Sequence, residues 1–201
     1  MVAPERLALL HTLVQQADRE RIPGDLVECG SWNGGSAAIM AAAGALGADE
    51  SARRVWVCDS FEGLPAPSTK DGALERDMFF TGWCTGDPRN VEGIFHRLAI
   101  PRQRLRIVKG RFDQTLPRAA IASIAILHID ADWYASVTCV LETLYDRVAS
   151  GGFVIFDDYG KWAGCRRAAQ DFIAKRRLGG LQRHQVGIGM YIRKALGAVA
   201  A

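Results

Sequence analysis

The sequence predicts an α/β fold: a Rossmann-like, doubly wound sheet that is mostly parallel and ends in an antiparallel hairpin. Short apolar segments alternate with amphipathic segments along the chain, which is the pattern of strands joined by crossover helices. The segments 124–130 and 153–157 are almost wholly apolar before their final acid, as expected for parallel strands that are buried on both faces. Both observations favour a sheet covered by helices on both sides.

The N-terminal region, residues 1–24, is expected to form one helix. Its apolar residues recur at spacings of three and four, and Pro23-Gly24 then ends the pattern. A strand over residues 25–30 follows and runs into a glycine turn. Ser36 is the expected N-cap of an alanine-rich helix over residues 37–46.

A second strand, 54–59, ends in an acid and is followed by a long segment rich in proline and polar residues, 61–90. Segments of that length in a compact domain usually bind or cover ligands. We therefore expect a lid or specificity loop at 61–90. A helix over residues 88–98 and a strand over 105–109 continue the alternation.

The remainder of the chain repeats the pattern. It predicts a buried strand, a helix that ends at Ser150-Gly-Gly, a second buried strand, another helix and a terminal hairpin, at residues 124–130, 136–148, 153–157, 164–177, and 181–186 with 190–193. With 201 residues, the chain is expected to be a single domain, 1–201, because domains commonly have about 100–200 residues.

Charge and cysteine content exclude several classes of protein. The formal net charge is only +3, which argues against nucleic acid or an anionic membrane as a partner. The basic run within 97–111 leaves an RNA-binding surface open, although a solvated face is the favoured interpretation. Five widely spaced cysteines without C-x-x-C favour reduced thiols and a cytoplasmic location. No secretion signal or bilayer-length apolar segment is visible.

Glycines and an acid follow the first two strands, where doubly wound sheets bind their ligands. Gly30, Gly34 and Gly35 form a turn that can bring backbone close to a ligand, although such turns are also common for structural reasons. Asp59 closes the second strand, where an acid often accepts hydrogen bonds from ribose hydroxyls. Together they favour an adenosine-containing cofactor over a turn-forming role for Asp59.

Four carboxylates follow the two most apolar strands. Asp130 and Asp132 come after the first, and Asp157 and Asp158 after the second. If the strands are neighbours, these like charges converge and raise one another's pKa, a conflict that Mg²⁺ with its preference for oxygen ligands would resolve. The alternative gives each acid a separate capping or turn role. His128, inside the apolar strand, is interpreted as a hydrogen-bonded core residue.

Five segments of the chain resemble the macrocin O-methyltransferase family of class I S-adenosylmethionine (SAM) methyltransferases. They are VWVCDSFEGLP at 55–65, GRFDQTLP at 110–117, DADWYAS at 130–136, GGFVIFDDYG at 151–160 and GCRRAAQDF at 164–172. The resemblance implies a class I methyltransferase sheet, dependence on SAM and Mg²⁺, and methylation of sugar hydroxyls of glycosylated natural products. It also implies a homodimer.

The resemblance assigns roles by position. It places the methionine end of SAM at Glu28, Gly30, Gly34, Gly35 and Ser36. It places the ribose at Asp59 and Ser60, and the adenine near Arg111, Phe112 and Asp113. The implied metal ligands are Asp130, Asp157 and Asp158, and the implied general base is Asp132.

The chain departs from the family pattern at three positions, and other functions remain open. Asn33, Ala131 and Trp133 stand where the family usually has Arg, Gly and Leu. A catechol-like diol is an alternative acceptor, and a SAM-binding scaffold without catalysis is an alternative to an enzyme. A nicotinamide dehydrogenase is disfavoured, because neither G-x-G-x-x-G nor Tyr-x-x-x-Lys occurs.

Overall fold

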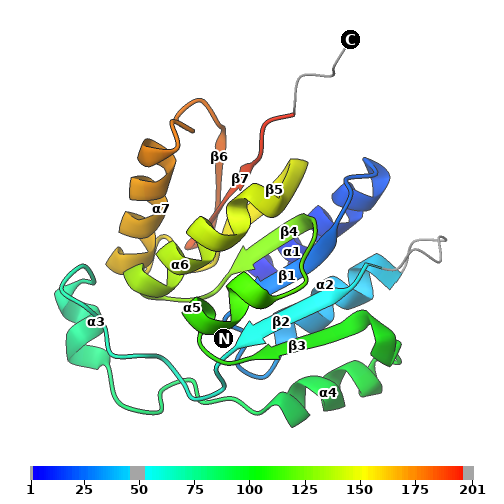
Figure 1. The fold of residues 1–201 in the computed structure, drawn as a ribbon, viewed down its shortest axis with the longest axis horizontal. Coiled ribbons are helices and arrows are strands. Elements are labelled where there is room, and N and C mark those ends of the chain that lie inside the picture. Colours follow the sequence, from blue (N-terminus) through cyan, green and yellow to red (C-terminus); the bar gives the residue numbers. More distant parts are fainter. Residues whose placement is uncertain (1, 46–52, 197–201) are drawn as a thin grey trace.

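The computed structural model describes residues 2–45 and 53–196, which contain one seven-stranded sheet (Figure 1). The strands are β1 (Asp25–Cys29), β2 (Val55–Asp59), β3 (Leu105–Lys109), β4 (Ile124–Ile129), β5 (Val148–Phe156), β6 (Arg183–Val186) and β7 (Gly189–Arg193). Their order is β3-β2-β1-β4-β5-β7-β6. Strands β1 to β5 are parallel, and β7 pairs antiparallel with both β5 and β6. The predicted doubly wound sheet with its terminal hairpin is confirmed.

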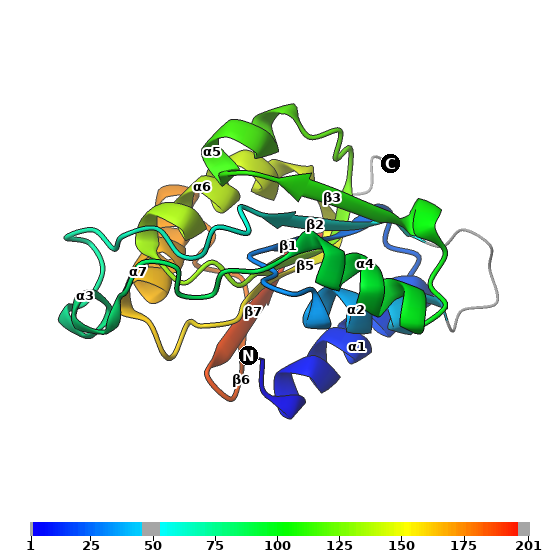
Figure 2. The same ribbon diagram turned by 90° about the horizontal axis from the view of Figure 1, so that it is seen from below.

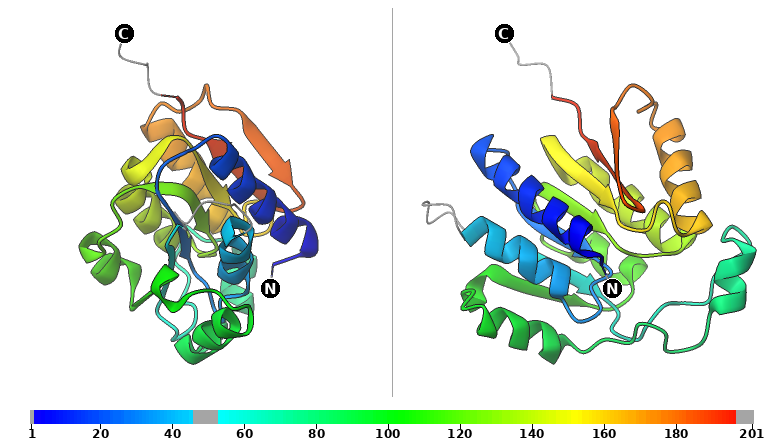
Figure 3. Two further views of the ribbon diagram at one scale, coloured as in Figure 1. Left: turned by 90° about the vertical axis from the view of Figure 1, so that its right-hand side faces the viewer. Right: turned by 180° about the vertical axis from the view of Figure 1, so that it is seen from behind.

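Helices cover both faces of the sheet (Figures 2 and 3). One face carries α1 (Pro4–Arg19), α2 (Gly35–Ala45) and α4 (Pro88–Arg97). The other carries α5 (Phe112–Thr115), α6 (Tyr134–Leu144) and α7 (Ala163–Lys175). Short 3₁₀ turns occur at Arg102–Arg104, Leu116–Arg118 and Tyr145–Arg147. The small helix α3 (Ala73–Met78) stands away from the sheet on the side of α6 and α7 (Figure 1).

The strand order reverses between β1 and β4, which is where ligands bind in doubly wound sheets. The two strands pair from their first residues to Cys29 and Ile129, so Gly30 and Asp130 leave the sheet side by side. Gly30 has a φ of +85°, and a Cβ there would lie 1.9 Å from the carbonyl oxygen of Asp130. Only glycine therefore fits the close approach of these two turns.

Two local predictions differ from the structure. Helix α2 begins at Gly35, so Ser36 lies inside its first turn instead of capping it. Strand β5 begins at Val148, and the register jumps from Ile124–Val148 to Ile126–Phe153. Ser150-Gly-Gly therefore forms an irregularity within the strand, because extra residues on one strand can bulge out of a sheet without ending it. The expected end of α2 at residue 46 lies outside the described residues.

The segments 61–90 and 97–111 contain more structure than expected. The first holds α3 and the start of α4, with turns and extended backbone between them. In the second, the guanidinium of Arg104 is buried and donates to the carbonyl oxygens of Arg53 and Ala41. The prediction that it lies on a solvated face is therefore wrong.

Among the described residues, no helix has the length and hydropathy needed to cross a bilayer.

Candidate active site

A cavity of about 1230 Å³ opens at the carboxyl ends of β1, β2, β4 and β5. It is larger than the roughly 300–1,000 Å³ of common small-molecule sites. Of the predicted site residues, these line it: Gly30, Gly35, Ser36, Asp59, Ser60, Arg111, Phe112, Asp113, Asp130, Asp132, Asp157 and Asp158. Glu28 and Gly34 are not among the residues that line the cavity, so any effect on a ligand passes through the residues in front of them.

Asp59 holds the glycine turn in shape. Its Oδ2 accepts hydrogen bonds from the backbone N–H groups of Ser31 and Trp32 at 2.7 and 2.8 Å. Its Oδ1 accepts one from the backbone N–H of Phe61 at 2.7 Å. A carboxylate has about four lone-pair positions, so Asp59 can still accept about one hydrogen bond from a ligand in the cavity. The buried Oγ of Ser31, beside it, has no partner among the described residues.

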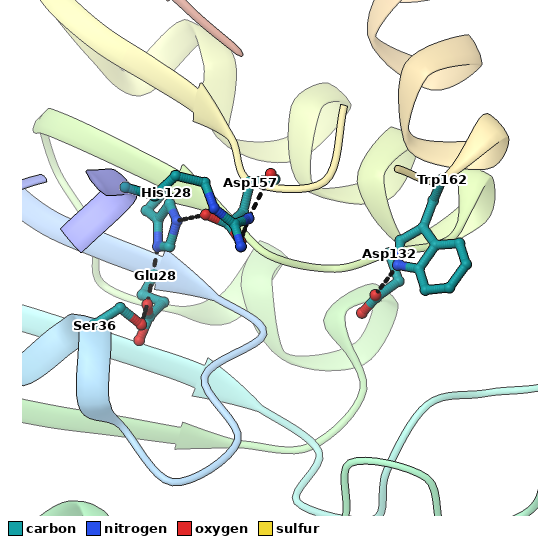
Figure 4. Close-up of polar contacts among 7 residues, drawn as sticks. Glu28, Ser36, His128, Asp132, Asp157 and Trp162 are labelled. Carbon is teal, nitrogen blue, oxygen red and sulfur yellow. Dashed lines mark hydrogen bonds and ion pairs between the residues drawn. The ribbon is translucent and has the colours of Figure 1, made fainter. Parts of the chain in front are cut away.

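Glu28 is fully buried behind the turn. Its Oε1 accepts a hydrogen bond from the Ser36 hydroxyl and lies 2.9 Å from Nδ1 of His128 (Figure 4). Glu28 and His128 are paired across β1 and β4, so the sheet register sets this contact. Through Ser36, Glu28 fixes the first turn of α2 against the sheet.

Asp157 is bound from inside the protein. Arg6 of α1 forms an ion pair with its carboxylate and donates to its carbonyl oxygen at 2.8 Å. His128 Nε2 lies 3.5 Å from Asp157 Oδ1 (Figure 4). Burial opposes the charged form of His128, but hydrogen bonds to Asp157 and Glu28 and their charges raise its pKa to about 10. The prediction of a hydrogen-bonded core histidine is confirmed, and His128 and Arg6 balance the two buried acids.

The other three acids face one another. Carboxylate oxygens of Asp130, Asp132 and Asp158 lie within 4.8 Å of one another. Burial first, and then the charge of Asp158, raises the pKa of Asp132 to about 8. Burial and neighbouring acids also raise the pKa of Asp130 and Asp158. Burial and mutual repulsion of the three acids thus outweigh the protein cations nearby, and the cluster would be stabilised by a bound cation.

The backbone at Asp132 is strained. Its φ is +53°, and the N–H of Trp133 donates to the carbonyl of Ala131 at 2.6 Å, which closes a tight three-residue turn. Residues outside glycine rarely adopt positive φ, although Asp is among the more tolerant. Such strain is concentrated at functional sites, and here it directs the Asp132 carboxylate toward the cluster.

Three tryptophans pack against one another beside Asp132 of the acidic cluster. The indole N–H of Trp162 donates to the Asp132 carboxylate at 2.6 Å (Figure 4). Rings of Trp133 and Trp162 lie 5.6 Å apart between centroids, and Trp83 lies 6.2 and 6.0 Å from them. All three line the cavity, and Trp133 and Trp162 also belong to the buried core.

Arg6, Asp71 and Glu75 contact site residues or the helices that follow them but were not predicted from the sequence. Arg6 lies on the buried face of α1, and a buried Arg needs an acid or carbonyl partner. The neighbouring Glu5 hid this signal, because it offered a local partner for Arg6 in the sequence. The helices α6 and α7 begin after Trp133 and Trp162, which make no capping hydrogen bond. Because neither tryptophan can cap its helix, a capping residue from elsewhere in the chain was to be expected. Asp71 and Glu75 are those residues.

Comparisons with known proteins agree with this arrangement. The sequence matches the macrocin-O-methyltransferase (TylF) family over residues 1–194. It is 39% identical over 175 residues to the 8-demethyl-8-(2,3-dimethoxy-alpha-L-rhamnosyl)-tetracenomycin-C 4'-O-methyltransferase of Streptomyces olivaceus, covering 86% of this chain and 66% of that protein. It is 35% identical over 179 residues to the demethyldecarbamoylnovobiocin O-methyltransferase of Streptomyces niveus, covering 87% and 68%. The chain thus spans about two thirds of the length of these relatives.

A solved structure has the same fold. The structure of the O-methyltransferase NovP superimposes with a TM-score of 0.84 and 30% sequence identity, covering 95% of this chain and 80% of that one. Both the sequence match and the fold extend over nearly the whole chain. The chain therefore belongs to the macrocin O-methyltransferase family.

Proposed function

We propose that this protein transfers the methyl group of SAM to a hydroxyl of a small acceptor, most favourably a sugar of a glycosylated natural product. One observation carries the proposal: the glycine turn at Gly30 and the acidic cluster of Asp130, Asp132 and Asp158 share one cavity. A donor site beside a carboxylate cluster suits methyl transfer to an activated oxygen. Relatives named as O-methyltransferases of a rhamnosyl-tetracenomycin and of demethyldecarbamoylnovobiocin support the acceptor class.

The donor half of the cavity fits a polar nucleoside ligand. Ser31 presents a buried hydroxyl that has no partner in the part of the chain that the structure describes, and Asp59 beside it retains about one unused lone-pair position. Ser60, Arg111, Phe112 and Asp113 border the same space and are assigned to the nucleoside end. Glu28, Gly34 and Ser36 shape the turn that would receive the methionine end.

The acidic half fits a hard divalent cation. The pKa of Asp132 and of its neighbours is raised because burial and mutual repulsion outweigh the nearby protein cations, and Mg²⁺ prefers such oxygen ligands. Asp130, Asp157 and Asp158 would hold it, with Asp157 shared between the cation and its partners Arg6 and His128. When bound, Mg²⁺ would lower the pKa of an acceptor hydroxyl and orient it.

The residues of the chain then have separate tasks. Asp132 accepts the proton of the acceptor hydroxyl, and the indole of Trp162 holds its carboxylate in place. The three tryptophans exclude water and offer flat surfaces to a sugar or an aromatic ring. The segment 61–87 covers the cavity and supplies Leu64, Pro65 and Trp83 to its wall.

Methyl transfer measured with and without a chelator tests the proposal. Purified protein with SAM is offered an aromatic rhamnoside and a catechol, in Mg²⁺ or in EDTA. We expect turnover of the rhamnoside in Mg²⁺ only. Full turnover in EDTA would contradict the metal, and preferred turnover of the catechol would favour the alternative acceptor.

A SAM-binding scaffold is the second candidate, because Trp133 is one of the three departures from the family pattern that the sequence resembles. It predicts SAM binding by calorimetry without turnover of any acceptor. Asp132→Asn distinguishes the enzyme from the scaffold: for the enzyme we expect turnover about 10²–10⁴ times slower with unchanged SAM affinity.

A single domain over 1–201, a cytoplasmic location and a homodimer stay predictions. The five free cysteines favour the cytoplasmic location.

A further inference from the structure

Two buried carboxylates of the segment that covers the cavity point at the beginnings of two helices. We call residues 61–87 the lid. Asp71 and Glu75 of the lid are only 4% and 2% exposed. Acids that are this deeply buried need hydrogen-bond donors, and theirs are the free N–H groups of α6 and α7.

Asp71 caps α6. Its Oδ1 accepts a hydrogen bond from the backbone N–H of Tyr134 at 2.7 Å, and its Oδ2 accepts from the backbone N–H and hydroxyl of Ser68 at 2.7 and 2.8 Å. The residue at the N-cap position of α6, Trp133, makes no side-chain capping bond. The lid therefore supplies a cap that the helix itself lacks.

Glu75 caps α7 in the same way. Its Oε1 accepts hydrogen bonds from the backbone N–H groups of Ala163 and Gly164, the second at 3.3 Å. Trp162, at the N-cap position of α7, makes no side-chain capping bond either. A negative charge at a helix N-terminus is also favourable for the helix dipole.

Gly164 makes room for Asp71. A Cβ at Gly164 would lie 1.9 Å from Asp71 Oδ1 and 2.8 Å from the backbone nitrogen of Tyr134. The lid carboxylate thus passes between the first turns of α6 and α7, and any larger residue at 164 would displace it. Three separate segments of the chain are fitted to one another at this point.

Both capped helices begin directly after the loops that carry the acidic cluster. Asp130 and Asp132 precede α6, and Asp158 precedes α7. We propose that Asp71 and Glu75 are positioning residues, which hold these two loops and so couple closure of the lid to the geometry of the cation site. The coupling to a cation rests on the proposed function, whereas the attachment of the lid does not.

Hydrogen exchange measured by mass spectrometry tests the attachment. Asp71→Ala, Glu75→Ala and Gly164→Ala should each make amides of the lid and of the first turns of α6 and α7 exchange about tenfold faster, because a lost charged hydrogen bond is worth that factor or more. Gly93→Ala is the control, since a Cβ at this glycine of α4 meets only the end of Arg97 at 3.5 Å. Exchange in the three variants equal to that of the control would overturn the proposal.

Cation affinity tests the positioning. We expect Mn²⁺, titrated by electron paramagnetic resonance without SAM, to bind Asp71→Ala and Gly164→Ala about tenfold more weakly than the parent protein, and the double variant no more weakly than either, because one contact is lost in both. A merely structural role would lower the melting temperature and leave the Mn²⁺ affinity unchanged, which would overturn the positioning role. A parent protein that binds no Mn²⁺ would contradict the proposed metal, and the exchange experiment would still decide the attachment of the lid.

Discussion

Arg6 and Asp157, which are 151 positions apart in sequence, form a buried ion pair beside the cavity. The pair joins the first helix to the carboxyl end of β5, and His128 contacts the same carboxylate. Asp157 therefore has direct cationic partners, whereas the pKa values of Asp130, Asp132 and Asp158 stay raised despite the more distant charges of Lys161, Arg6 and His128. The four acids that follow β4 and β5 thus have two different electrostatic environments.

Removal of Arg6 is expected to destabilise the protein. Arg6→Met leaves a buried carboxylate with a single cationic partner, and breaking a buried pair commonly costs about 3–5 kcal/mol. Urea unfolding measures the loss, and adding Asp157→Asn should recover part of it. Arg89→Met is the control: its partner Asp87 lies at the surface, so the change should be below about 1 kcal/mol. Equal effects of the two substitutions would contradict the importance of the buried pair.

Substitution can show whether Asp157 is the third ligand of the proposed cation, beside Asp130 and Asp158. Asp157→Asn and Asp158→Asn should each weaken Mn²⁺ binding by about tenfold or more, as expected when a charged ligand is lost. Arg6→Met should strengthen it, because Arg6 competes for the Asp157 carboxylate. If calorimetry finds the Mn²⁺ affinity of Asp157→Asn unchanged, the Asp157 carboxylate binds only Arg6 and His128, and Asp132 becomes the third ligand of the cation.

The indole of Trp162 is expected to tune the proton acceptor. Its hydrogen bond lowers the pKa of Asp132, against the larger effects of burial and Asp158. Trp162→Phe should therefore move the acidic limb of the pH profile of methyl transfer up by about one pH unit, the equivalent of one hydrogen bond of about 1.4 kcal/mol. Trp133→Phe, which loses only a bond to the carbonyl of Pro65, should leave that limb in place.

Stability without a cation should fall as the pH rises. Asp132 has a folded pKa of about 8 against an ordinary 3.8, so between about pH 4 and pH 8 the folded state holds a proton that the unfolded state has released. Melting temperatures in EDTA should decrease across this range, and less so in Asp132→Asn. Mg²⁺ should remove most of the decrease by compensating the charge. A flat melting curve for the parent protein in EDTA would refute the raised pKa.

Much of the sheet could be predicted because its strands have strong local signals. The β3 segment 105–109 and the β4 segment beginning at Ile124 were found from their apolar runs and the residues that bound them. The start of β5 was missed because Ser150-Gly-Gly resembles a helix stop, and only pairing with β4 reveals it as an irregularity within a strand.

The site could be predicted in part. Sequence placed Asp130, Asp132, Asp157 and Asp158 at one edge, since the carboxyl ends of neighbouring parallel strands meet there. It did not foresee that Arg6 binds Asp157, because a contact between distant segments leaves no local pattern. Asp71 and Glu75 were missed for the same reason: they cap helices that lie far from them in sequence.

The clustering of Trp83, Trp133 and Trp162 has an optical consequence. Three of the five indoles of the chain gather where the lid meets α6 and α7, and Trp83 alone among them belongs to the lid. Lifting Trp83 from the other two would expose it to water and weaken the exchange of excitation among them. The ultraviolet emission of the unlabelled protein should therefore report whether the entrance is open.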